Sequence, residues 1–396
     1  MALLDRVSTR SRIAGLSGDL SGSVADLGIF VPLVAALVLV NGLAPGPLLI
    51  VAGLLALGSG LWFRIPFPVQ PLKALTALAV AQRLAPEAIR AAGLMIGLVL
   101  VALTLTGTAD RLARAFTRPV IRALQLAVGS LLIVSAWRLA VAPPAVFVDP
   151  PAPATTVTLA AVVATLVAIA VWRRWYAAGA VVLALGALAS WVASPPTLGS
   201  IALTGLEPAL PPLEVFASAF VLLVVPQLPL TYGNAVVGMA DLARERFPEA
   251  TRVRPGSVAL SCGVGNVASA LLGGMPMCHG SSGFSAHVRL GARTARMNVL
   301  LGGTFLVLGV ALADQVLILF GLLPVWALAG FLAYAGLRHA LLVLDLRGAP
   351  LVVAIGAGAL GVVTGNLALT TGVALVAAWA PRIVERMRAG RAARTA

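Results

Sequence analysis

The sequence predicts an all-α protein that crosses a membrane many times, with about fourteen spans. The chain has 396 residues, of which 60% are hydrophobic and 11% charged, and its mean hydropathy is +1.01. An average soluble domain is about 25% charged. The hydrophobic runs approach the roughly 20 residues that a helix needs to cross a bilayer. The arginines gather between those runs, as expected for loops outside the bilayer.

The hydrophobic runs form two sets of seven, separated by a proline-rich connector at 194–214 that carries little charge. We expect residues 1–193 to form the first half, 215–381 the second, and 382–396 a basic tail. Because some runs are short or opened by proline, twelve spans are the alternative count. The predicted spans are 17–40, 44–63, 67–83, 88–106, 119–141, 155–171 and 176–193, then 215–238, 256–274, 276–290, 296–313, 315–338, 350–363 and 365–381.

The arginines predict the orientation of the chain. The net charge is +14, and Lys73 is the only lysine, so 27 of the 28 basic residues are arginines. With the N-terminus inside and the spans alternating, 24 arginines face the cytoplasm, and only Arg83, Arg90 and Arg138 lie outside. Cytoplasmic loops are enriched in arginine and lysine. We therefore expect a multi-pass protein of the inner (plasma) membrane, with both termini cytoplasmic and the connector periplasmic. We assign the net positive charge to the cytoplasmic side of the membrane, so it does not indicate binding of nucleic acid.

The prolines suggest that the two halves are inverted repeats with broken helices. Pro66 and Pro276 open the third run of each half, while Pro32 interrupts the first run and Pro226 and Pro229 the eighth. Inverted repeats with interrupted helices are a recurring plan of membrane transporters, and the interruptions mark the substrate site.

Lys73 is the most informative single residue. It lies in the apolar stretch FPVQPLKALTALAV, where a charge at mid-bilayer costs about 2.5–3.5 kcal/mol and therefore needs a partner or a task. We expect an extended segment through Pro66 and Pro68 and then a helix beginning near Gln70. The free N–H groups at such a helix end attract anions. The alternative is a structural ion pair between Lys73 and Asp26.

A second stretch, PMCHGSSG at 276–283, has matching features. Pro276 blocks a helix before it, because proline is accepted in the first turn of a helix but not in its interior. Gly280, Ser281, Ser282 and Gly283 offer small side chains, backbone N–H groups and two hydroxyl groups. This combination allows an oxyanion to approach the backbone closely.

The neighbouring pair Cys278 and His279 allows several interpretations. His279 could donate a hydrogen bond to an anion or titrate near neutral pH, or it could be a packed structural residue. A catalytic or metal-binding pair is disfavoured, because His287 and His339 are poorly placed in the sequence to complete it. We expect no metal site, no cofactor and no enzyme activity.

Polar residues also interrupt the first and eighth runs. Asp26, Gln227, Thr231 and Asn234 lie inside otherwise apolar spans. A carboxylate within a membrane is a candidate ion-coupling or proton site, so Asp26 is the ion-coupling candidate, with pairing to Lys73 as the alternative. Gln227 and Asn234 could line the substrate site or bond backbone groups freed by the prolines.

Four stretches together resemble the molybdate transporters related to sulfate permeases. They are LSGSVADLGIFVPLVAALVLVNGL from residue 20, IPFPVQPLKA from 65, PQLPLTYGNAVVGMADLA from 226, and GNVASALLGGMPMCHGSSGFSAHVRLGART from 265. The resemblance covers nearly the whole chain, and PVQPLK followed by PMCHG is its most specific part. Sulfate permeases usually carry a cytoplasmic regulatory domain after the last span, and we expect none here.

The resemblance implies a fold of seven plus seven inverted segments. In that fold segments 3 and 10 are short strands followed by half-helices, whose N-termini face each other across the substrate. The family stretches correspond to Pro68–Lys73 and Cys278–Gly280 in this chain, and the family often has glycine where Ser282 stands. The predicted substrate-binding residues are Gln70, Lys73, Gln227, Thr231, Asn234, Cys278, His279, Gly280, Ser281 and Ser282.

The function expected from these observations is oxyanion uptake by alternating access, with molybdate as substrate. Two helix N-termini contribute about +0.5 each, and with Lys73 they give about +2, which balances a tetrahedral dianion. Proton or sodium coupling and a homodimer are considered, and neither is fixed by the sequence. The alternatives are a sulfate permease lacking the regulatory domain, an anion channel of the same fold and, more remotely, an intramembrane enzyme.

Overall fold

The computed structural model describes residues 15–25, 27–147, 150–173, 175, 178–199, 203–206 and 208–380. Asp26 and the tail at 382–396 lie outside the described residues. Residues 15–23 are helical. The elements of the first half are then α2 (Leu27–Leu39), α3 (Pro45–Phe63), β1 (Gln70–Pro71), α4 (Lys73–Ala81), α5 (Pro86–Leu105), α6 (Thr108–Ala113), α7 (Arg118–Val141), α8 (Pro153–Trp172) and α9 (Ala178–Ala193).

The second half begins with a long helical segment that contains two π-helical stretches. Its elements are η1 (Leu213–Val215), α10 (Phe216–Ala219), η2 (Phe220–Val224), α11 (Val225–Leu230), η3 (Thr231–Val237) and α12 (Gly238–Arg246). There follow α13 (Pro255–Leu272), β2 (Met277–Cys278), α14 (Ser281–Arg289), α15 (Arg296–Ala311), η4 (Ala313–Gln315), α16 (Val316–Gly321), α17 (Val325–Ala340), η5 (Leu341–Asp345), α18 (Ala349–Thr364) and the helix Leu367–Ala380.

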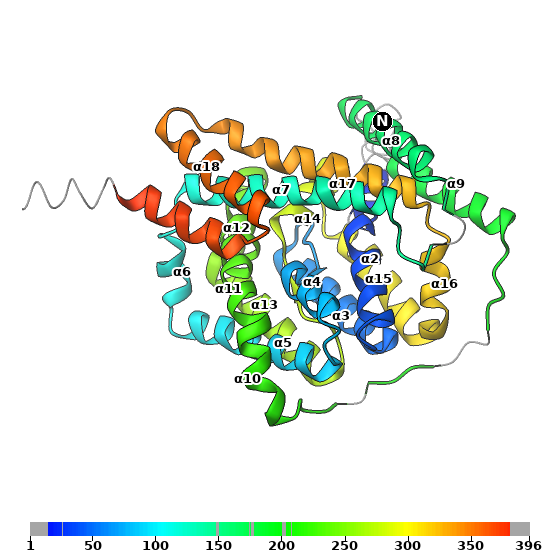
Figure 1. Ribbon diagram of the computed structural model, residues 1–396, viewed down its shortest axis with the longest axis horizontal. Coiled ribbons are helices and arrows are strands. Elements are labelled where there is room, and N and C mark those ends of the chain that lie inside the picture. Colours follow the sequence, from blue (N-terminus) through cyan, green and yellow to red (C-terminus); the bar gives the residue numbers. More distant parts are fainter. Residues whose placement is uncertain are drawn as a thin grey trace, which may run out of the picture.

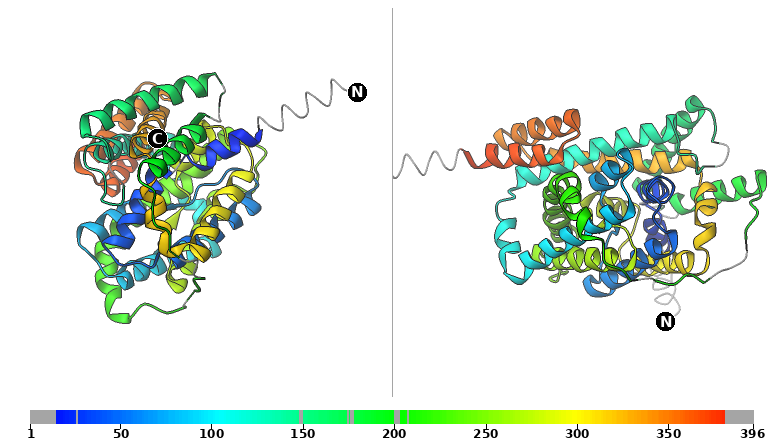
Figure 2. Two further views of the ribbon diagram at one scale, coloured as in Figure 1. Left: turned by 90° about the vertical axis from the view of Figure 1, so that its right-hand side faces the viewer. Right: turned by 60° about the horizontal axis from the view of Figure 1, so that its bottom comes forward.

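The helices of the two halves pack against each other in matching pairs. α3 lies against α15, α5 against α13, and α7 against α17. In the same way α7 contacts α18, while α17 contacts α8. Figure 1 shows α7, α17 and α18 across the top of the molecule, with α3, α4, α5 and α13 below them. The right-hand view of Figure 2 shows α7 crossing above these helices as well. In an inverted repeat, a contact made by a helix of one half should recur for the corresponding helix of the other half, and the contacts α7–α18 and α17–α8 fit this expectation.

Two of these pairs depend on glycine at the point of contact. A Cβ atom on Gly53 of α3 would lie 2.8 Å from the carbonyl oxygen of Gly302 on α15, and the reverse distance is also 2.8 Å. Gly97 of α5 and Gly263 of α13 meet in the same way, at 2.9 and 3.0 Å. Helices in membranes associate through such small residues, which let the backbones approach closely.

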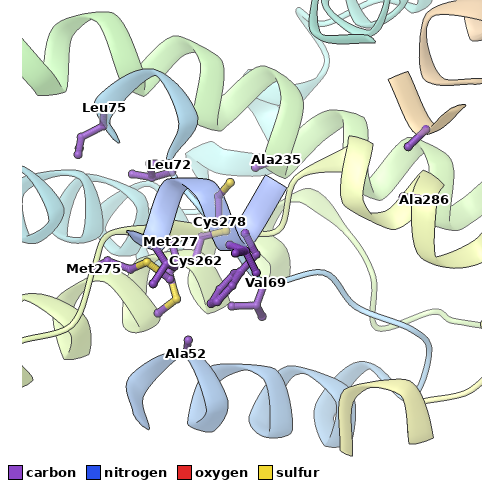
Figure 3. Packing of buried hydrophobic residues seen from close by; sticks show 14 of the residues in the cluster. Ala52, Val69, Leu72, Leu75, Ala235, Cys262, Met275, Met277, Cys278 and Ala286 are labelled. Carbon is purple, nitrogen blue, oxygen red and sulfur yellow. The ribbon is translucent and has the colours of Figure 1, made fainter. Parts of the chain in front are cut away.

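The two short strands meet at the centre of the molecule. β1 and β2 pair antiparallel, with Gln70 opposite Cys278 and Pro71 opposite Met277. Figure 3 shows Met277, Cys278 and Val69 gathered around this crossing, with Ala52 of α3 beneath them in this view. A two-residue pairing cannot satisfy the backbone of both segments, so side chains must bond the remaining groups.

Two buried asparagines bond the backbone on either side of this crossing. Asn266 of α13 accepts a hydrogen bond from the N–H of Met277 at 2.9 Å and donates to its carbonyl at 2.7 Å. Asn298 of α15 does the same for Phe67, at 2.8 and 2.6 Å. Each asparagine therefore stands in for a missing strand neighbour. Asn266 holds the strand segment that follows its own helix, whereas Asn298 holds a segment of the other half, 231 positions away.

The prediction of a polytopic helical protein with strand and half-helix elements in segments 3 and 10 is confirmed. In the part of the chain that the structure describes, seven helices are long and apolar enough to cross a membrane, or eight if the bent pair Arg296–Ala311 and Ala313–Gly321 is one span. Four shorter apolar helices and the half-helices α4 and α14 occupy the other predicted positions. The count of fourteen spans stays a prediction.

Two local details around the half-helix α4 and the eighth run differ from the sequence-based expectation. The helix after Pro71 begins at Lys73, not near Gln70, because residues 70–71 pair with β2. Pro226 and Pro229 do not break the eighth run, since the helix continues from Leu213 to Arg246. Proline removes a backbone donor and displaces the carbonyl four residues earlier, and two π-helical stretches take up this change.

The first and twelfth runs also differ. Pro32 lies inside α2, and the interruption of the first run is the turn at 24–25 that precedes it. The run predicted at 315–338 is two helices, α16 and α17, with Pro324 directly before α17. Proline restricts the residue before it to extended conformations, so the chain turns at this point.

Candidate functional site

Lys73 is the first residue of α4, and its ammonium group points to the facing half-helix. Its Nζ donates to Oε1 of Gln70 at 2.6 Å and to Oγ of Ser282 at 3.1 Å. Gln70 belongs to β1 and Ser282 to the first turn of α14. The lysine therefore joins the two half-helices at the strand crossing. Both partners are neutral oxygens, so neither of them balances the positive charge of Lys73.

Glycine in the first turn of α14 makes room for this arrangement. A Cβ atom on Gly280 would lie 2.5 Å from Oε1 of Gln70 and 3.4 Å from Nζ of Lys73. A Cβ atom on Gly283 would lie 2.3 Å from Nε2 of Gln70. The Gln70 amide thus lies flat against the start of α14. Sequence analysis included Gly280 in the site but not Gly283, whose role depends on a contact 213 positions away in the chain.

The long π-containing helix supplies polar groups to both half-helices. Gln227 accepts a hydrogen bond from the N–H of Leu75, in the first turn of α4, at 2.8 Å. Its Nε2 donates to Oγ1 of Thr231 at 2.9 Å. Asn234 accepts the hydroxyl hydrogen bond of Ser281, the first residue of α14. Thr231 and Asn234 both lie in η3, and π-helical segments of this kind occur often at functional sites.

His339 is a residue of this cluster that sequence reasoning missed. It lies on α17, is fully buried, and places Nε2 3.4 Å from Oγ of Ser281. The sequence-based interpretation weighs His339 only as a partner for a catalytic or metal-binding pair of Cys278 and His279. The packing of α17 against α14 brings it to the start of the half-helix. No local signal in the sequence indicates this contact.

His279 was predicted to contact the substrate, but in the structure its ring is surrounded by protein groups. Its Nδ1 lies 2.8 Å from the carbonyl oxygen of Pro68 and its Nε2 2.8 Å from Oγ of Ser261. The ring is fully buried and lies edge-on to Phe67, with centroids 4.6 Å apart. Both nitrogens are thus occupied by protein atoms. This geometry favours the packed, structural interpretation, in which His279 ties the two strand segments together.

The half-helices lie at one end of a cavity of about 460 Å³. Of the ten predicted substrate-binding residues, five line it, namely Lys73, Gln227, Thr231, Asn234 and Cys278. Gln70 and Ser282 accept hydrogen bonds from Lys73. Gly280 leaves room for the Gln70 amide, and Ser281 donates to Asn234. The cavity follows α7 from Val128 to Arg138, a distance of about 15 Å along a helix. Arg138 and Ser135 are lining residues that sequence analysis did not include.

The electrostatics of the cavity favour an anion. Its charged lining residues, among those that the structure describes, are Lys73 and Arg138, and both are positive. The N-terminus of α4 opens toward the same space and adds about half a positive charge. No group of three His, Cys, Asp or Glu side chains that could hold a metal is present in the described residues. Asp26 lies outside the described residues, so its pairing with Lys73 stays a prediction.

The fold and the site define a polytopic membrane transporter in which two half-helices, joined by antiparallel strands, face a polar cavity. Solved structures with this fold include the transmembrane domain of the cyanobacterial bicarbonate transporter BicA, at 20% identity and a TM-score of 0.51, covering 92% of this chain and 97% of that one. They also include SLC26A9, at 13% identity and a TM-score of 0.57, covering 93% of this chain and 65% of that one. At these identities the likeness shows the fold.

The chain belongs to the molybdate transporter family. A sequence model of the family described as "Molybdate transporter of MFS superfamily" matches residues 18–132 and 219–338, which is more than half of the chain. "Molybdate transporter 2" of Arabidopsis thaliana is 28% identical over 389 residues, covering 84% of this chain and 80% of that protein. The matched ranges include both half-helices and the π-containing helix. The protein is therefore a transporter and not an enzyme.

Proposed function

We propose that this protein takes up molybdate across the plasma membrane by alternating access, with both termini in the cytoplasm. The observation that carries the proposal is the position of Lys73. Its ammonium group lies between the two half-helices, at one end of a cavity whose charged lining residues are all positive in the described part of the chain. The family and the named relatives supply the choice of molybdate among oxyanions.

The charge of the site supports a dianion. Lys73 supplies +1, and the two helix N-termini supply about +0.5 each. With a neutral substrate Lys73 would have no negative partner among the described residues, which is costly at low dielectric. A tetrahedral dianion would accept hydrogen bonds from Lys73, from the hydroxyl groups of the first turns and from backbone N–H groups. Molybdate, tungstate and sulfate share these features, so competition among them belongs in the test.

The cavity is proposed to open to the periplasm. It reaches Arg138 at the end of α7 and residues 364–367 between α18 and the last helix. The distribution of arginines predicts that both lie outside. On the opposite side Arg122 joins α7 to Asp241 of α12 at 3.0 Å. The arrangement therefore corresponds to an outward-open state, closed by ion pairs on the cytoplasmic side.

The proposal is tested by Lys73→Gln, which removes the charge and keeps a polar side chain of nearly the same length. A charge-assisted hydrogen bond contributes about 1.5–3 kcal/mol, so we expect the affinity for molybdate to fall about 10- to 150-fold. Calorimetry on folded, monodisperse protein measures the affinity, with tungstate and sulfate as competitors. Arg173→Gln, at the end of α8, is the charge-matched control and should bind like the parent. Equal affinity of parent and Lys73→Gln would show that Lys73 is not a substrate ligand.

Coupling to a proton or sodium ion is proposed to involve Asp26, because an intramembrane carboxylate is a candidate coupling group. Asp26→Asn should keep molybdate binding in detergent and lose concentrative uptake into proteoliposomes that carry an ion gradient. A parallel loss of binding and uptake would instead support a structural ion pair with Lys73. Uptake that needs no gradient in the parent would favour the channel alternative.

A homodimer is also proposed, and the molar mass of the purified protein tests it.

A further inference from the structure

A second cavity lies apart from the substrate site and shares no lining residue with it. Its volume is about 690 Å³, and it is bounded by α8, α17, the middle of α7 and the last residue of α14. Its walls are mostly alanine, valine, leucine and isoleucine, with Trp172 at the end of α8. Two charged residues line it, Arg289 of α14 and Arg338 of α17. No carboxylate lines it among the described residues.

The charges around Arg289 are mainly positive. Arg338 and Arg246 are its positive neighbours and Glu245 its negative one. Glu245 is already shared, since it lies 3.7 Å from Arg122 and 3.5 Å from Arg246. Neither Arg289 nor Arg338 has a salt bridge to a described carboxylate. Two guanidinium groups from different helices are thus held near each other, and no described carboxylate is paired with either of them.

Arg338 also has an unsatisfied hydrogen-bond donor in the described part of the structure. Its Nε is buried and has no hydrogen-bond partner among the described residues. A buried donor without an acceptor costs about 1–3 kcal/mol, and the cost is offset if a ligand supplies the acceptor. Guanidinium groups are suited to bind phosphate oxygens through two parallel hydrogen bonds.

We propose that this cavity binds an anionic phospholipid, with its phosphate between Arg289 and Arg338 and an acyl chain along the apolar walls. The apolar walls distinguish a lipid from a free phosphate ion, which would gain nothing from them. The position near Arg246 also fits, because arginines at helix ends on the predicted cytoplasmic side meet the anionic leaflet. Trp172 is 76% exposed and Arg173 lies over its ring at 5.0 Å, as expected at a membrane interface.

A lipid held in this way would join two parts of the transporter. Arg289 ends the half-helix that begins at the substrate site, and Arg338 lies on α17, which packs against α14. A ligand that binds both would stabilise the folded protein by an amount that grows with the logarithm of its concentration relative to its dissociation constant. The lipid should therefore raise the unfolding temperature, and both arginines should be needed for the effect.

The test uses the purified full-length protein in detergent. Thermal unfolding is measured with phosphatidylglycerol, phosphatidylcholine or inorganic phosphate added, and native mass spectrometry measures bound lipid. We expect phosphatidylglycerol to raise the unfolding temperature, with little effect of the other two. Each basic residue near an anionic lipid contributes about fivefold in affinity, so Arg289→Gln with Arg338→Gln should weaken phosphatidylglycerol binding about 25-fold. Arg111→Gln, on the exposed helix α6, is the control and should bind like the parent.

Three results would overturn the proposal. They are equal stabilisation by phosphatidylglycerol and phosphatidylcholine, stabilisation by inorganic phosphate as large as by the lipid, or full lipid binding by the double variant. If the double variant does not fold, the single variants decide the matter, and each should lose about fivefold. Single variants that fold and bind like the parent would also contradict the site.

Discussion

At the scale of single residues, Gly280 shows how closely the site is packed. Its φ is −61°, a value open to every residue, so the need for glycine is steric. Gly280→Ala would place Cβ 2.5 Å from Oε1 of Gln70, and the Gln70 amide that holds Lys73 would have to move. We expect the affinity for molybdate to fall at least about tenfold, since misplacing one charge-assisted contact costs over 1 kcal/mol. Gly303→Ala, in α15, meets nothing within 4 Å and should leave binding unchanged and stability slightly higher. Equal affinities in all three proteins would mean that the Gln70–Lys73 contact does not position the substrate.

At the scale of elements, a buried ion network joins α7 to α12 and to the end of the α17 segment. Arg122 is 1% exposed and lies 3.0 Å from Asp241 and 2.6 Å from Asp345. Removing one partner of a buried pair costs about 3–5 kcal/mol, and we expect the lower end for Arg122→Leu because both carboxylates are partly exposed. Arg118 also contacts Asp345, at 2.9 Å, but is 63% exposed, so Arg118→Leu should cost at most about 1 kcal/mol. Denaturation in detergent measures both variants. A similar small loss for the two would show that burial of Arg122 contributes little to the packing of these helices.

At the scale of the whole molecule, the orientation in the membrane is open to direct measurement. The connector at 194–214 should be periplasmic and the loop from Arg244 to Arg254 cytoplasmic, because 24 of 27 arginines then face inside. The native cysteines, Cys262 and Cys278, are both buried, and Cys278 lines the substrate cavity, so labelling of the parent protein sets the background for a single cysteine added to either loop. In intact cells an impermeant maleimide should label the connector and not the arginine loop. The reverse pattern would invert the topology, and the substrate cavity would then open to the cytoplasm.

The sequence by itself determined the class of protein, and it predicted the hydrophobic segments and the two stretches of the candidate site. Hydrophobic length and arginine placement depend on the bilayer, and proline acts on its own neighbours in the chain, so these features can be recognised without knowing the fold. The prolines also predicted a helix start close to Lys73, while the facing of the two helix starts was implied by the family resemblance. The tertiary structure decided which groups meet. The contacts of Asn298 with Phe67, of His339 with Ser281, and of Gly283 with Gln70 join residues 58 to 231 positions apart. The roles of His279 and of the prolines in the eighth segment were decided in the same way. The hydrogen-bond partner of a histidine ring depends on which groups packing brings to it. A helix can continue through a proline when its backbone changes its winding, as in the π-helical stretches η2 and η3. Neither condition can be recognised in the local sequence.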